Sequence, residues 1–170
     1  MRAKDRLPPE KAAFLAGYLC HLQADWMWVT DIFVPVFGLR NSWAPFPERL
    51  YIHNVLRAYL DNQILPSLRN GVASNLIQVS PGNWLPFVTA EDLAKWHTFL
   101  ADQLQPGANI KTIDVFAARQ GIQPDAYLQL LSSESRMERE VFTHMSRASL
   151  ERYREAVIRE NTELLNKFMG

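Results

Sequence analysis

Two long stretches without proline constrain the fold of this chain more than any other feature. Residues 10–33 carry apolar side chains at helical spacing with no interrupting proline, and residues 134–169 contain neither proline nor glycine. Because proline and glycine commonly end helices, the sequence predicts a long helix over each stretch, with at most one bend in the second. Strand-type alternation of apolar and polar residues is absent. The predicted fold class is therefore all-α.

The first predicted helix is apolar around most of its circumference. Its large apolar side chains are Phe14, Leu15, Tyr18, Leu19, Leu22, Trp26, Trp28 and Ile32. A helix that is hydrophobic on all sides is normally enclosed by others. We therefore expect a bundle around a central, buried first helix, together with a long C-terminal helix that has a solvated or a partner-binding face.

Shorter helices are expected between these two. The patterns predict helices from Pro47 to about Leu65 or Leu68, from a capping box at Thr89 to Leu104, over residues 111–120, and from Pro124 onward. A Pro106-Gly107 break ends the second of these. Residues 70–86 have no clear period and are expected to be loop, with a short strand possible only at 76–79.

Length and charge narrow the class of protein. A chain of 170 residues suits a single helical domain over residues 1–170, and 18 basic residues balance 18 acidic ones, so no nucleic-acid partner is expected. The longest apolar run has eight residues, too few for a membrane span. Cys20 is the only cysteine, which excludes an internal disulfide. The expected location is cytoplasmic, and the sequence leaves the oligomeric state open.

His21 and Asp25 form the first candidate site. Their spacing of four residues puts them side by side on the first helix, on a face that the pattern predicts to be buried. A buried carboxylate needs a partner, and imidazole with carboxylate suits zinc. The alternative is structural, with Asp25 fixing the His21 tautomer or forming a salt bridge with it.

The second helix carries a similar polar stripe. His53, Arg57 and Asp61 follow one another at four-residue spacing, so antiparallel packing could bring His53 and Asp61 to the first pair and complete a metal site. Arg57 favours the opposite interpretation, because a permanent cation repels a metal ion. The alternative is an Arg57–Asp ion-pair network without metal.

These residues carry a family resemblance. The run from Ala13 to Asp25, Ala-Phe-Leu-Ala-Gly-Tyr-Leu-Cys-His-Leu-Gln-Ala-Asp, and the run from Tyr51 to Asp61 resemble the zinc-dependent phospholipase C family, which is related to single-strand nucleases of similar helical fold. The resemblance covers about residues 10–65. It implies that His21 and Asp25 are zinc ligands, as are His53 and Asp61. Arg57 stands where the family has a glutamate.

The family also draws ligands from a segment ahead of the first helix, which this chain is expected to lack. The resemblance implies a zinc-dependent phosphoric-ester hydrolase acting on a small-molecule or lipid phosphoester, with one or more zinc ions as cofactor. Asp25 and Arg57 are the catalytic candidates. The alternative is a non-catalytic helical protein that uses a buried His/Asp/Arg network in a binding or interaction module.

Overall fold

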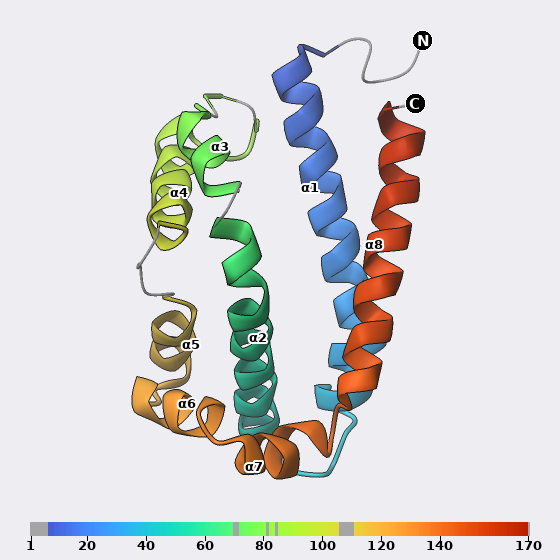
Figure 1. The fold of residues 1–170 in the computed structure, drawn as a ribbon, viewed down its shortest axis with the longest axis vertical. Helices are drawn as coiled ribbons and strands as arrows, with labels where there is room; N and C mark the ends of the chain where they lie inside the picture. The colour runs from blue at the N-terminus through green and yellow to red at the C-terminus, as the bar shows by residue number, and fades with distance from the viewer. Residues whose placement is uncertain (1–6, 70–71, 81, 84, 106–110, 170) are drawn as a thin grey trace. The chain divides into compact units, whose positions relative to one another are not determined.

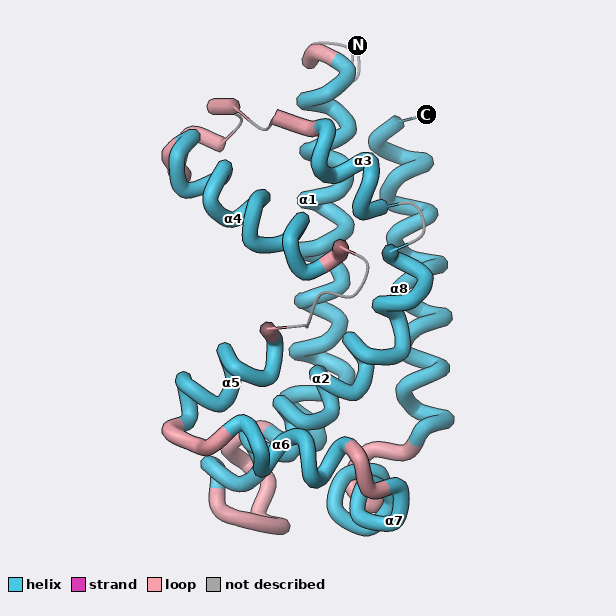
Figure 2. The backbone as a smooth tube through the Cα atoms, turned by 60° about the vertical axis from the view of Figure 1, so that its left-hand side comes forward, coloured by secondary structure: helices cyan, strands magenta, loops and turns pink. Residues whose placement is uncertain are grey.

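The computed structural model describes residues 7–69, 72–80, 82–83, 85–105 and 111–169. Every regular element in these ranges is a helix, which confirms the predicted all-α fold (Figure 1; Figure 2). The chain divides into two compact units, one made of residues 1–53 and 137–170 and the other of residues 54–136. Helix α2 (Phe46–Arg69) contributes to both. Each unit is described by itself.

Helix α1 (Pro9–Trp28) opens the first unit. Its start follows from local chemistry, because Pro9 occupies the first turn, where its missing N–H is harmless, and the Ala12 N–H donates to the Pro8 carbonyl at 2.9 Å. The helix continues as the π-helix η2 (Val29–Phe37), which contains Pro35. The helical path therefore runs four residues beyond its predicted end near Phe33.

Helix α8 (Arg147–Met169) lies antiparallel to α1 in Figure 1. The Tyr153 hydroxyl donates to the Ala24 carbonyl at 3.0 Å, and the Tyr153 ring meets Trp28 edge to face at 5.3 Å. Only Ala12 and Ala16 of α1 are buried. Within this unit, the enclosure predicted for the first helix is therefore limited to the side that α8 covers, and Leu22 and Trp26 are exposed.

The stretch predicted as one terminal helix contains a break. It is divided into α7 (Glu134–Arg136), the π-helix η3 (Met137–Phe142) and, after a turn, α8. The Ser146 hydroxyl accepts from the Ser149 N–H at 3.2 Å, which caps the new helix. The buried side chains of Met137, Val141 and Met145 hold the segment before the cap.

The loop between η2 and α2 is held by the buried Arg49. Its guanidinium donates to the carbonyls of Phe37 and Gly38, both at 3.2 Å, and to that of Ala44. Gly38 is needed here because a Cβ would lie 2.6 Å from the Val34 carbonyl oxygen. Three backbone acceptors of this turn are thus satisfied by one side chain.

The second unit contains α3 (Val72–Gln78), α4 (Ala90–Gln103), α5 (Thr112–Gln120), α6 (Pro124–Leu131) and α7. The Thr89 cap on α4 is confirmed, since its hydroxyl accepts from the Asp92 N–H at 3.1 Å. Helix α3 contradicts the prediction that residues 70–86 are loop, in which a short strand was possible only at 76–79. Seven residues are too few for a helical period to show, and α3 packs on α4. The predicted break at 106–107 lies outside the described residues.

Candidate functional site

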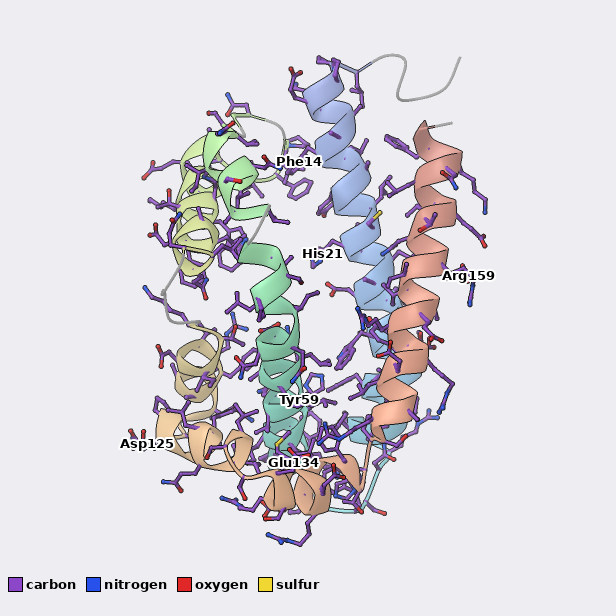
Figure 3. The ribbon with its side chains drawn as sticks, viewed as in Figure 1. Phe14, His21, Tyr59, Asp125, Glu134 and Arg159 are labelled. Carbon is purple, nitrogen blue, oxygen red and sulfur yellow. The ribbon has the colours of Figure 1, made fainter. Side chains whose placement is uncertain are left out.

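His21 and Asp25 are neighbours on α1, as their spacing predicts. His21 Nε2 lies 3.4 Å from Asp25 Oδ2. The side chains are 65% and 66% exposed, so the predicted burial of this pair is wrong. In Figure 3, Phe14 and His21 lie on the side of α1 that faces away from α8. The pair therefore belongs to the uncovered side of the helix.

His53 is buried among aromatic rings. The rings of Phe33, Phe37 and Trp28 have their centroids 4.9, 5.2 and 5.7 Å from that of His53. The Trp28 Nε1–H donates to His53 Nε2 at 2.9 Å. Because an acceptor nitrogen carries no proton, His53 has its proton on Nδ1, and a metal ion at Nε2 would have to displace the indole N–H. The sequence predicted this burial but not the tryptophan partner.

Arg57 and Asp61 contact the N-terminal half of α5. The Thr112 hydroxyl donates to Asp61 Oδ2 at 2.9 Å, and the Arg57 guanidinium lies over the Phe116 ring, 4.8 Å from its centroid. Burial raises the pKa of Asp61, while the Thr112 hydrogen bond and the Arg57 charge oppose that rise. The two residues therefore join α2 to α5.

The remaining histidines have similar structural contacts. His97 Nε2 lies 2.5 Å from the Leu76 carbonyl oxygen, which links α4 to α3. The His144 ring stacks on Trp43 with centroids 3.6 Å apart. Burial lowers the pKa of His144, and the Glu48 carboxylate opposes that shift.

The fit of a zinc ion can be tested on these donors. Tetrahedral zinc with ligands at about 2.0 Å places neighbouring donor atoms about 3.3 Å apart, so the His21–Asp25 distance suits two corners of a site. A catalytic zinc takes three protein ligands. Among the described residues, no group of three or more His, Cys, Asp or Glu could hold a metal ion. The donors present do not complete a zinc site, and zinc binding stays a prediction.

The uncovered side of α1 is the feature that the sequence analysis missed. Trp26, Leu22 and Val29 are 69%, 45% and 42% exposed. Tyr18, partly exposed, lies one turn before Leu22, and its ring stacks on Phe14. The all-round hydrophobicity of this helix was the available signal. It indicated apolar surface correctly but did not show which part the fold would cover.

Comparisons with known proteins give no match. No protein-family model, curated protein or solved structure matches the chain. The resemblance to zinc-dependent phospholipase C therefore rests on the motif residues of α1 and α2 alone and stays a prediction.

Proposed function

We propose that this chain is a non-catalytic helical interaction protein that binds a protein partner through the uncovered side of α1. We call this surface the α1 face. It is defined by Tyr18, His21, Leu22, Asp25 and Trp26 of α1 together with Val29, the first residue of η2. The observation that carries the proposal is the exposure of Trp26 together with that of its apolar neighbours Leu22 and Val29. Contiguous exposed apolar surface of this kind is typical of association sites.

A protein partner fits this face better than a lipid surface. Helices that lie on membranes are rich in Lys and Arg, whereas α1 contains one lysine and no arginine. Asp25 places a carboxylate within the face, where anionic lipid would repel it. No helix in the described part of the chain is long and apolar enough to cross a bilayer. Tryptophan and tyrosine, by contrast, are enriched in protein interfaces.

The contacts of the other candidate residues support a non-catalytic role. His53 accepts from Trp28, Asp61 accepts from Thr112, and Arg57 packs on Phe116. Each of these interactions stabilises local structure. These contacts support a structural role for the polar stripe of α2. In the proposed function, the His21–Asp25 pair contributes polar groups to an interface.

Photo-crosslinking tests the proposal. With p-benzoyl-phenylalanine in place of Leu22, we expect a discrete adduct in the native host cell that disappears when Trp26→Asp is added and that purified unlabelled protein competes away. The matched control is the same amino acid in place of Ile158, an exposed apolar residue of α8, which should give no such adduct. Equal adducts from both positions, or none from position 22, would overturn the proposal.

A zinc-dependent phosphoester hydrolase is the second candidate function, favoured by the 3.4 Å His21–Asp25 distance and by the motif resemblance. The two candidates differ in their metal content. If the chain is an interaction protein, we expect it to contain no stoichiometric zinc after purification without a metal-binding tag. Its Tm should not rise when zinc is added. One equivalent of zinc that His21→Ala removes would favour the hydrolase instead.

A further inference from the structure

The α1 face is complementary to itself. With about 100° of rotation per residue, and with His21 as zero, Asp25 lies at about 40°, Tyr18 at about 60°, Val29 at about 80°, Leu22 at about 100° and Trp26 at about 140°. The face therefore has three lengthwise rows of two residues each. They are His21 with Asp25, Tyr18 with Val29, and Leu22 with Trp26.

The three rows share one midpoint. The midpoint of the His21–Asp25 row is at residue 23, and that of the Leu22–Trp26 row is at residue 24. The midpoint of the Tyr18–Val29 row lies between residues 23 and 24. In an antiparallel helix pair related by a two-fold axis, each residue meets the residue of the same row that lies equally far beyond the axis. A single axis beside residues 23–24 therefore pairs every row with itself.

From this geometry we infer that the partner of the α1 face is a second copy of this chain, packed antiparallel about that axis. The inference rests on the proposed function and names its partner. Across the axis, Leu22 meets Trp26 of the second copy, Tyr18 meets Val29, and His21 meets Asp25. Apolar residues thus contact apolar residues, and the one imidazole faces the one carboxylate.

Charge fixes the direction of this pairing. In a parallel two-fold pair the rows at the two edges of the face exchange, so His21 and Asp25 would lie opposite Leu22 and Trp26 of the second copy. Asp25 would then face apolar side chains, which is unfavourable for a carboxylate. In the antiparallel pair, His21 of each copy lies opposite Asp25 of the other copy. These two contacts between helices add to the His21–Asp25 contact of 3.4 Å within each helix. The chain has a formal net charge of zero, so no long-range repulsion keeps two copies apart.

The size of the face predicts a weak, reversible dimer. From Tyr18 to Val29 the helix rises about 16 Å. Stable interfaces usually bury about 800 Å² on each partner, more than a helix segment of this length supplies. The dimer should therefore appear only as the protein concentration rises, and it should be sensitive to single substitutions in the face.

Sedimentation equilibrium on the purified full chain tests the inference. We expect the mean mass to rise from one chain toward two across about 5–500 µM. His21→Asp opposes carboxylates across the axis and should weaken association about tenfold. The double variant His21→Asp with Asp25→His exchanges the charges and should restore the wild-type affinity within about threefold, because the exchanged pair is again complementary. Helix content and dilute-solution Tm are checked for every variant.

Three results would overturn the second-copy partner. They are a monomer at every concentration, an unchanged affinity in His21→Asp, and a double variant no stronger than the single one. The proposed function fails separately. A monomeric chain whose position-22 probe still gives a Trp26-dependent adduct of another mass rejects the second copy but keeps the interaction face. No adduct at position 22, either in the host cell or with the purified chain at about 500 µM, rejects the face itself.

Discussion

The fold shifts the pKa of the Tyr153 hydroxyl clearly from its ordinary value. It donates to the Ala24 carbonyl at 3.0 Å, and only the protonated phenol can do so. Burial, followed by the nearby carboxylates of Asp25 and Asp31, raises the pKa of Tyr153 to about 12. The folded chain therefore keeps this proton at a pH where the unfolded chain has released it.

This difference predicts how Tyr153 contributes to stability. Below the unfolded-state value of about 10 the contribution is fully present, and it is lost as the pH rises through about 12. Tyr153→Phe should lower the free energy of unfolding by about 1 kcal/mol at pH 8, and the difference from wild type should shrink between pH 10 and 12. Urea unfolding at several pH values measures it. Tyr18→Phe is the control, and a pH-independent difference would contradict the prediction.

Contacts of a single residue are predictable from the sequence where its partner lies one helical turn away. The spacing of His21 and Asp25 predicts their proximity, and the structure confirms it at 3.4 Å. Their exposure could not be predicted in the same way, because it depends on which distant segment covers α1. The hydrogen bond between Trp28 and His53 joins residues 25 positions apart and left no trace in local spacing.

At the scale of elements, the turn between η2 and α2 depends on Arg49. Its guanidinium satisfies the carbonyls of Phe37, Gly38 and Ala44 from a buried position. Arg49→Met keeps the apolar stem but removes the guanidinium donors from the Phe37 and Ala44 carbonyls, whereas the Gly38 carbonyl keeps the Asn41 N–H at 3.0 Å. The expected loss is about 2–4 kcal/mol in the free energy of unfolding, measured by urea denaturation.

Arg40 supplies the matched control for this substitution. It lies in the same loop but is exposed, so Arg40→Met should change the free energy of unfolding by less than about 0.5 kcal/mol. Equal effects of the two substitutions would show that the guanidinium contacts of Arg49 contribute nothing specific to the turn.

Element boundaries were predictable where one residue type determines them. Pro9 begins α1, Thr89 caps α4, and Gly121, at a φ of 65°, ends α5. The break before α8 also has a local signal, the capping serine Ser146, but the absence of proline and glycine masked it. Helix α3 has no comparable signal, because its only buried residue, Ala73, is small.

On the scale of the whole molecule, composition and periodicity predict helices throughout, and this is confirmed for the described residues. The prediction of one domain over residues 1–170 came from length alone. It stays a prediction, because length does not reveal how contacts are distributed; they group the chain into two compact units, each of which includes part of α2. The predicted convergence of four metal ligands also depends on tertiary packing, which no local sequence pattern determines. These ligands are His21, Asp25, His53 and Asp61.

Uneven burial predicts that the molecule does not open all at once. Helix α2 contains a continuous buried run from Ile52 to Leu56, whereas Ala73 and Ala101 are the only buried residues that α3 and α4 contribute. Large apolar side chains of α4, such as Trp96, remain exposed. Helices with so little buried apolar surface gain little from packing, so their amides should exchange through openings that cost less than global unfolding.

Native-state hydrogen exchange in low urea measures these openings. We expect the amides of α3 and α4 to exchange together at a lower free energy than those of residues 52–56 in α2. The amides of α6, whose Tyr127 and Leu130 are buried, serve as the control within the same unit and should stay protected. Protection in α4 equal to that in α2 would contradict this order. It would mean that forces other than side-chain burial hold α3 and α4 in place.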